Sequence, residues 1–376
     1  MPDRSSITAG RRKRIDRLLA TLNEKKLSGI FISQPENRRY LSGFRPSDPQ
    51  LDESSGFLIL GPDLAILGTD PRYEMEAFQQ ARGFQPFIYR GGLEGSWPEL
   101  QKRLPPLKRL AFESPALSYH SYRRLKKLFL KGRAPVTLVP TFHLVEGLRA
   151  QKDPSELKAI KRSLAITERA FQEVLSRLKP GQTEKEISWR IKQLIHLHGG
   201  DDPAFEPIVA SGPQAALPHA ESTDREIKKG EPVLFDLGSK WQGYCSDMSR
   251  TVFLGKPSER FKEVYRLVRE AQLKAQEGIR SGMDTRKVDG LVRSIIEKGG
   301  YGTYFKHSLG HGVGLATHEI PSLNPLKADL LRPGMVVTIE PGIYLSGWGG
   351  VRLENMAVIR KNGARLLSHD MNFYNF

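Results

Sequence analysis

Residues 233–253 read VLFDLGSKWQGYCSDMSRTVF, two apolar stretches that each carry one aspartate. If they form a hairpin that turns around Trp241 and Gln242, Asp236 and Asp247 fall opposite each other, with Cβ atoms about 4.5–5.5 Å apart. Two ionised carboxylates that close on a buried surface repel each other and lose their hydration. Because a bound cation removes that penalty, the stretch predicts a metal site on a small sheet.

The same arrangement recurs in residues 336–358, which read VVTIEPGIYLSGWGGVRLENMAV. A hairpin centred on Gly347 places Glu340 opposite Glu354. A single acid in a strand commonly marks a bulge or an edge, but two opposed pairs favour metal binding. Carboxylates suit hard or borderline divalent ions, and two ions about 3.5–4 Å apart need carboxylates that bridge them.

A nitrogen ligand is available in Gly310-His311-Gly312, where the flanking glycines permit close backbone approach and leave the imidazole room. His307 and His318 lie on either side of this tripeptide, and His219 lies earlier in the chain. We assign no function to the other five histidines, which are His120, His143, His196, His198 and His369.

The rest of the chain divides into two expected domains, an α/β domain at 1–148 and an α+β domain at 149–376. In the first, we predict a helix at 14–26, strands at 30–33 and 110–112, and a hairpin whose strands are 57–60 and 65–67. In the second, capping patterns at Asp153 and Thr183 predict two helix starts. Apolar periodicity predicts two more helices near 258–279 and 285–298.

Composition excludes several classes of function. The net charge of +16 comes from Lys and Arg spread along 376 residues, without zinc-finger spacing or an aromatic RNA-binding motif, so no nucleic-acid partner is expected. A single cysteine, Cys245, excludes an internal disulfide and a cysteine-based zinc site. No apolar run reaches about 18 residues, and none follows the basic residues 11–14, so we expect no membrane association and a cytoplasmic location.

Taken together, these motifs resemble the pita-bread metallopeptidases, which include methionine aminopeptidase, aminopeptidase P and prolidase, and above all their Xaa-Pro peptidases. Residues 39–44 (RYLSGF) and 69–73 (TDPRY) resemble the creatinase-type N-terminal domain of the proline-specific members. The resemblance spans nearly the whole chain. It implies an α/β creatinase-like N-terminal domain followed by an α+β pita-bread catalytic domain.

The resemblance also implies roles for individual residues. Asp236 would hold one metal ion, His311 and Glu340 the other, and Asp247 and Glu354 would bridge the two. The residues implied in catalysis are His219, His307, His318, Glu340 and Arg352.

The implied reaction is hydrolysis of the Xaa-Pro bond, in dipeptides or at the N-terminus of longer proline-containing peptides. Two divalent ions, with manganese preferred over cobalt, zinc or iron, would supply a bridging hydroxide near neutral pH. Glu340 would accept a proton, and His219 or His318 would stabilise the oxyanion. Since such enzymes are commonly dimers, a homodimer is expected.

Two alternatives compete with this interpretation. Creatinase shares both domains and hydrolyses a C–N bond without metal, but five intact ligand positions argue against it. A catalytically altered pita-bread protein that binds peptide or nucleic acid would have no reason to keep those five residues.

Overall fold

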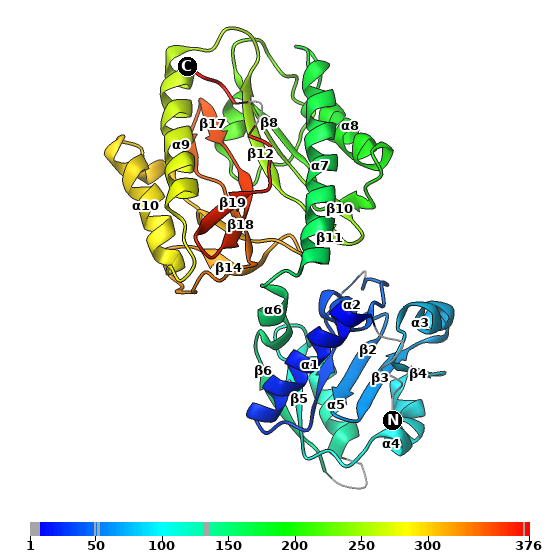
Figure 1. The fold of residues 1–376 in the computed structure, drawn as a ribbon. Coiled ribbons are helices and arrows are strands. Elements are labelled where there is room, and N and C mark those ends of the chain that lie inside the picture. The colour runs from blue at the N-terminus through cyan, green and yellow to red at the C-terminus, as the bar shows by residue number, and fades with distance from the viewer. Residues whose placement is uncertain (1–7, 49, 51–52, 131–134, 371–372) are drawn as a thin grey trace. The chain divides into compact units, whose positions relative to one another are not determined.

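The computed structural model describes residues 8–48, 50, 53–130, 135–370 and 373–376 (Figure 1). The chain divides into two compact units, called here unit 1 (Met1–Arg149) and unit 2 (Ala150–Phe376). Among the described residues, no helix has the length and apolar character that crossing a bilayer requires.

Unit 1 is an α/β domain on a six-stranded mixed sheet, in the order β4-β3-β2-β1-β5-β6. Its strands are β1 (Gly29–Ile32), β2 (Phe57–Gly61), β3 (Leu64–Thr69), β4 (Gln85–Ile88), β5 (Arg109–Glu113) and β6 (Thr137–Thr141). Its helices are α1 (Ala9–Glu24), α2 (Pro35–Ser42), the short η2 (Pro71–Tyr73), α3 (Glu74–Gln80), α4 (Leu93–Arg103), α5 (Tyr119–Leu130) and α6 (Leu144–Arg149).

The predicted elements of unit 1 are present, with shifted ends. The hairpin β2–β3 closes with Gly61 opposite Leu64, and β1 pairs antiparallel to β2 and parallel to β5. Helix α1 starts five residues before the predicted 14–26 and buries Ile15, Leu18 and Leu22. The apolar spacing fixes the buried face of this helix, whereas its basic first turn carries no apolar signal.

Unit 2 contains several small antiparallel sheets rather than one large one. A five-stranded sheet has the order β14-β13-β15-β18-β19, two three-stranded sheets have the orders β12-β9-β8 and β11-β10-β7, and a two-stranded sheet is β16-β17. The strands are β7 (Asp202–Pro203), β8 (Ile208–Ser211), β9 (Pro232–Leu237), β10 (Ser239–Trp241), β11 (Tyr244–Cys245), β12 (Met248–Phe253), β13 (Gly310–Gly312), β14 (Glu319–Leu323), β15 (Val336–Ile339), β16 (Gly342–Leu345), β17 (Gly349–Arg352), β18 (Asn355–Arg360) and β19 (Gly363–Leu366).

The helices of unit 2 form two pairs (Figure 1). They are α7 (Pro154–Ser176), α8 (Glu184–Leu197), α9 (Glu259–Gly278) and α10 (Thr285–Lys298), with the short η3 (Gly212–Ala216) and η4 (Gly302–Tyr304). The pair α7 and α8 packs on β9 and β12 in one cluster, where Phe171 contacts Phe235. The pair α9 and α10 packs on β15, β16 and β17 through residues such as Val268 and Ile339. The strands that hold or flank the acids at 236, 247, 340 and 354 therefore contribute to these two apolar clusters.

The helix starts of unit 2 follow the capping patterns of the sequence. The side chain of Asp153 accepts hydrogen bonds from the backbone N–H groups of Ser155 and Glu156, and Glu156 accepts one from the Asp153 N–H. Thr183 and Glu186 form the same reciprocal pair at the start of α8. The first box satisfies three free N–H groups at its helix end, and the second satisfies two.

Candidate metal centre

The first acidic hairpin has a different register from the one the sequence suggested. Strand β9 pairs with β12 so that Asp236 lies opposite Ser249, and Asp247 comes just before β12. The prediction that Asp236 and Asp247 are directly opposed is therefore wrong by two positions. Because strand side chains alternate with a period of two, this offset keeps both carboxylates on one face as diagonal neighbours.

The turn explains the error. Trp241 pairs with Tyr244, so the two-residue turn is Gln242-Gly243 rather than Trp241-Gln242. Both turn residues have positive φ, 48° and 72°. That combination is what a type I′ hairpin requires, and it favours Gly at the second position.

The second acidic hairpin has the predicted register. Ile339 pairs with Asn355 in β15–β18, and Gly342 pairs with Arg352 in β16–β17. Both pairings share one register, so Glu340 and Glu354 lie opposite each other at the junction between the two small sheets. Glu340 and Glu354 lie outside the strand pairing at this junction, so their backbone can turn the carboxylates toward the site.

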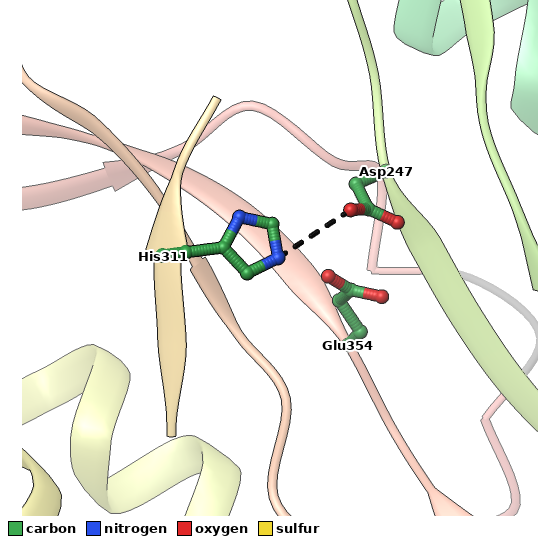
Figure 2. A group of neighbouring side chains, drawn as sticks. All are labelled: Asp247, His311 and Glu354. Atoms are coloured by element: carbon green, nitrogen blue, oxygen red, sulfur yellow. Dashed lines mark ion pairs between the residues drawn. The ribbon is translucent and has the colours of Figure 1, made fainter. Parts of the chain in front are cut away.

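His311 on β13 brings the two hairpins together. Its Nε2 lies 3.3 Å from Glu340 Oε1 and 3.6 Å from Asp247 Oδ2, and its Nδ1 lies 3.0 Å from the carbonyl oxygen of Gly312. Figure 2 shows the imidazole pointing toward Asp247 and Glu354, whose ligand atoms and that of His311 lie within 4.8 Å of one another. Since a carbonyl only accepts, Nδ1 carries the hydrogen and Nε2 faces the carboxylates, as in metal-binding histidines.

The glycines beside His311 have a steric cause. A Cβ on Gly310 would lie 2.2 Å from the carbonyl oxygen of Thr338, and one on Gly312 would lie 2.4 Å from that of Ile320. The glycines therefore let β13 lie tightly between its neighbours, which fixes the place from which His311 reaches the acids.

The cluster carries more negative charge than its surroundings neutralise. Burial and the carboxylates of Glu354 and Asp236 raise the pKa of Asp247 well above its usual range, and burial with Glu340 and Asp236 does the same for Glu354. Burial is the largest single influence and would raise the pKa of Glu340, but the hydrogen bond to His311 together with the charges of His311, His307 and Arg352 lowers that pKa to about 2. Burial alone would lower the pKa of His311, but Glu340 and Glu354 raise it to about 9. The imidazolium of His311 and the guanidinium of Arg352 together carry too little positive charge to balance four carboxylates.

Two of the carboxylates use one oxygen and leave the other without a partner. Arg352 Nη2 donates to Asp236 Oδ2 at 2.5 Å, and Ser249 Oγ donates to Glu354 Oε2 at 2.9 Å. Asp236 Oδ1 and Glu354 Oε1 are buried and have no hydrogen-bond partner in the described part of the chain. Buried unpaired carboxylate oxygens cost several kcal/mol unless a cation binds them. This set of oxygen and imidazole donors fits hard or borderline divalent ions.

Arg352 organises the polar side of the site. Besides Asp236, its guanidinium donates to Ser249 Oγ at 2.9 Å, to Tyr344 Oη at 2.8 Å and to the carbonyl oxygen of Pro218 at 3.0 Å. Its contact with Pro218 also fixes the segment that precedes His219. The arginine therefore positions three parts of the chain around the acids.

His307 belongs to the same network. Its Nδ1 lies 2.8 Å from the carbonyl oxygen of Ser308 and its Nε2 2.8 Å from Tyr344 Oη. Because the carbonyl only accepts, Nδ1 carries the hydrogen and Nε2 accepts from the tyrosine hydroxyl. Burial lowers the pKa of His307, which keeps this ring neutral. His307 is thus engaged at both nitrogens and supports the site.

The remaining candidate histidines line a cavity of about 1060 Å³ together with the acids. His318 packs its ring 4.3 Å from that of His311, and burial lowers its pKa. His219 is far from both in the sequence, in the loop after η3, but it lines the same cavity. The structure therefore brings all the predicted site residues to one place, including Arg352.

Sequence reasoning missed Tyr344 and Ser249. Tyr344 links Arg352 to His307, and Ser249 links Arg352 to Glu354. Tyrosine is common in strands, so its presence at position 344 did not indicate a site residue. The strand pairing gave the only indication: Arg352 pairs with Gly342 and Tyr344 with Gly350, which places Tyr344 and Arg352 on the same face of β16–β17.

Comparison with known proteins agrees with this architecture. Residues 14–151 match the creatinase/prolidase N-terminal domain, and residues 158–361 match metallopeptidase family M24. The Xaa-Pro dipeptidase of Pyrococcus furiosus is 32% identical over 370 residues, covering 95% of this chain and 98% of the relative.

Solved structures give the same result. An Xaa-Pro dipeptidase from Bacillus anthracis superposes with a TM-score of 0.89 at 36% identity, over 96% of this chain and 98% of that one. An X-Pro aminopeptidase from Thermotoga maritima gives 0.85 at 31% identity, over 94% and 97%. With a creatinase-type N-terminal domain and a pita-bread catalytic domain, the chain belongs to metallopeptidase family M24.

Proposed function

We propose that this chain is a dinuclear metal-dependent peptidase that hydrolyses the Xaa-Pro bond, in dipeptides and at the N-terminus of longer peptides. The observation that carries the proposal is the buried group of four carboxylates and one imidazole, in which Asp236 Oδ1 and Glu354 Oε1 have no donor in the described chain. Relatives that match at least 94% of this chain bear the names Xaa-Pro dipeptidase and X-Pro aminopeptidase.

Each ligand would have a defined place. Asp236 would hold one ion through Oδ1, because Arg352 occupies Oδ2. His311 and Glu340 would hold a second ion, while Asp247 and Glu354 would bridge the two. Two divalent ions match the charge of four carboxylates, whereas a single ion would leave the buried cluster anionic.

The protein's own groups would then guide the reaction. Divalent ions bound here would activate water as a nucleophile and polarise the scissile carbonyl. Glu340 would accept the proton of the attacking water, because it lies at the cavity wall beside His311. His219 or His318 would donate to the carbonyl oxygen as negative charge develops there. His307 and Arg352 would hold these groups in position.

The cavity supports a substrate class wider than dipeptides. Its volume of about 1060 Å³ lies slightly above the roughly 300–1,000 Å³ typical of ligand pockets. An exopeptidase that cuts after the first residue can use surplus space only for a large first side chain or for residues that follow proline. We therefore include longer peptides among the substrates.

The remaining details of the proposal are manganese as the working metal, with cobalt, zinc or iron as alternatives, a homodimer, and a cytoplasmic location. Oxygen-rich ligation favours manganese over a closed structural zinc site. Light scattering on the purified full chain would measure the oligomeric state.

The test uses protein stripped of metal and resupplied with manganese, cobalt, zinc or iron. Ala-Pro and Ala-Pro-Ala are the substrates, and Ala-Ala and Ala-Ala-Ala are the matched controls without proline. We expect metal-dependent cleavage of the proline substrates only. Equal cleavage of the controls would overturn the proline assignment, and cleavage by stripped protein would overturn the metal assignment.

A further inference from the structure

A second buried arginine lies behind the metal centre. Arg250 is on β12 and is 1% exposed. Its neighbour Ser249 turns its side chain toward Glu354 and Arg352, so Arg250 points to the opposite face of the strand. Burying a guanidinium costs free energy unless acceptors surround it, so the contacts of Arg250 indicate its role.

Arg250 holds the backbone at Glu354. Its Nη1 donates to the carbonyl oxygen of Glu354 and, at 3.0 Å, to that of Ser249, while its Nη2 donates to Asn355 Oδ1 at 3.0 Å. The N–H of Glu354 donates to the same Ser249 carbonyl at 3.0 Å. Residue 354 is therefore fixed through its N–H, its carbonyl and its carboxylate by two consecutive residues of β12.

The C-terminal end of the chain packs against this arginine. The guanidinium of Arg250 lies 4.3 Å from the ring centre of Phe373, and that of Arg269, on α9, lies 3.8 Å from it. Phe373 therefore contacts both guanidinium groups. Contacts of this kind are attractive, and they strengthen when the cation is desolvated.

Further contacts fix the residues that follow. The N–H of Tyr374 donates to Tyr265 Oη at 3.1 Å, and the hydroxyl of Tyr374 accepts from the N–H of Phe253 at 3.0 Å. Tyr374 also stacks on Phe376 at 5.0 Å. The C-terminal segment, residues 373–376, is thus fastened to α9 and to the end of β12, the strand that carries Arg250.

We propose that Arg250 is a positioning residue for Glu354 and that the C-terminal segment holds Arg250 in place through Phe373. This inference rests on the proposed role of Glu354 as a metal ligand. A carboxylate among three others is pushed away by repulsion, so its backbone must be held if it is to stay at ligand distance. Arg352 restrains the cluster from the cavity side, and Arg250 restrains it from behind.

The test measures manganese affinity of metal-stripped protein by calorimetry, beside the melting temperature of the same metal-free samples. Partners of metal ligands typically change affinity by about 10–100-fold when removed. We expect Arg250→Met to weaken binding within that range, Arg250→Lys to recover part of the loss, and Phe373→Leu to weaken binding by roughly tenfold. Arg266→Met is the matched control, because Arg266 lies over Phe376, 5.9 Å from its ring centre, on the same helix as Arg269.

The outcomes separate three cases. Weaker binding in Arg250→Met and Phe373→Leu, with Arg266→Met like the wild type, supports the inference. Lower melting temperatures with unchanged affinity would overturn it and leave a packing role only. Should Arg250→Met fail to fold, Phe373→Leu decides the question alone. If the wild-type chain binds no manganese, cobalt, zinc or iron, the proposed function itself fails. That failure appears in the wild type, so it is distinct from any difference between the wild type and the variants.

Discussion

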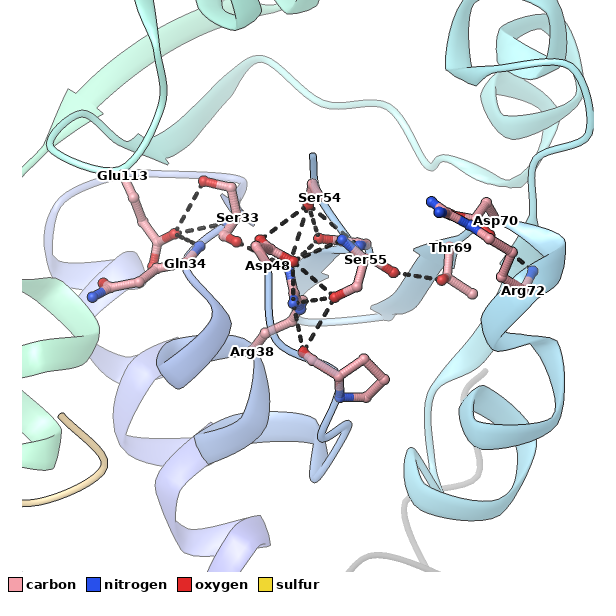
Figure 3. A network of polar contacts seen from close by, with 12 residues as sticks. Ser33, Gln34, Arg38, Asp48, Ser54, Ser55, Thr69, Asp70, Arg72 and Glu113 are labelled. Atoms are coloured by element: carbon pink, nitrogen blue, oxygen red, sulfur yellow. Dashed lines mark hydrogen bonds and ion pairs between the residues drawn. The ribbon is translucent and has the colours of Figure 1, made fainter. Parts of the chain in front are cut away.

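Both units bury carboxylates, but they neutralise them in opposite ways. In unit 1, Asp48 accepts from Arg38 at 3.0 Å and from the Ser55 N–H at 2.7 Å, and Glu113 accepts from the N–H groups of Ser33 and Gln34 at 2.8 Å each (Figure 3). In unit 2, the acids around His311 face mainly one another. A buried acid surrounded by donors is part of the scaffold, whereas a buried acid surrounded by acids must take up a proton or bind a cation from outside.

The difference does not depend on the unit in which the acid lies. Glu184 in unit 2 is fully buried, and it accepts from the N–H and Oγ of Ser211 at 2.7 Å each and from Thr223 Oγ1 at 2.7 Å. It ties α8 to neighbouring loops and lies outside the acid cluster. Donor supply therefore distinguishes structural acids from candidate ligands within one domain.

Asp247→Asn should have the largest effect, because it removes an acid that is surrounded by other acids. Replacing a candidate ligand should lower kcat/KM by at least about 10³-fold, or about 4 kcal/mol. It should also abolish most of the stabilisation by manganese, about 2.7 kcal/mol at one hundred times Kd in the wild type. The melting temperature of the metal-free variant should equal or exceed that of the metal-free wild type, because one repelling acid is gone.

Glu184→Gln is the control for this variant. It removes an acid whose oxygens all have donors, so it should destabilise the metal-free protein by about 1–3 kcal/mol and leave manganese affinity within twofold. If Asp247→Asn destabilised the metal-free protein as much as Glu184→Gln does, the distinction between the two kinds of acid would fail.

The next effect concerns unit 1. Arg38→Met leaves Asp48 buried without its cation, which should lower the free energy of unfolding by about 3 kcal/mol in urea titrations. The side chain of Arg38 is 0% exposed and that of Asp48 is 15% exposed, so solvent can compensate only a little. Manganese affinity should not change. A loss below about 1 kcal/mol would show that the pair is not a structural requirement.

The stability of the protein should depend on pH through Glu113. Burial raises the pKa of Glu113 to about 7, against hydrogen bonds from Gln34, Asn37 and Ser33 that lower it, and the nearby Glu146 adds to the rise. The folded state therefore keeps a proton that the unfolded state loses between about pH 4.5 and 7. Stability should fall as pH rises through this window, by at most about 3 kcal/mol.

Glu113→Gln should flatten this dependence, because the variant has no proton to lose. Unfolding of the full chain at pH 5, 6, 7 and 8 measures the slope for both proteins. A slope that persists unchanged in Glu113→Gln would assign the effect to another group. Donors alone would then be enough to keep Glu113 ionised.

Much of the site could be predicted because its signals are local. Acids inside apolar strands, a glycine-flanked histidine and the capping residues Asp153 and Thr183 each have a short-range cause. Register is also local when a turn is unambiguous, and the centre at Gly347 gave the correct opposition of Glu340 and Glu354.

The rest depends on contacts between distant segments. The one-residue displacement of the turn to Gln242-Gly243 follows from backbone dihedrals that composition does not fix. The partners of Arg352 come from residues 218, 236, 249 and 344, and the ring beside Arg250 comes from residue 373. Such networks arise only when several strands meet, so single-sequence periodicity does not reveal them.

The smallest effect is expected for the hydroxyl of Tyr344, which links Arg352 to His307. Tyr344→Phe removes a hydroxyl that accepts from Arg352 and donates to His307, but leaves the ring packing intact. Arg352 keeps its direct contact with Asp236, so manganese affinity should change less than threefold. His307 loses its donor while buried, which should lower kcat/KM by about tenfold, or about 1.4 kcal/mol.

Tyr301→Phe is the control, since the hydroxyl of Tyr301 donates to Glu263 at the surface and should not affect kcat/KM. If Tyr344→Phe weakened manganese binding as strongly as it lowered kcat/KM, the hydroxyl would be holding Asp236 through Arg352. If it changed neither, the direct contacts of Arg352 would suffice. In that case, the contrast between the units would rest on the acids and their immediate donors, because a buried hydroxyl one step further out would contribute nothing measurable to the metal centre.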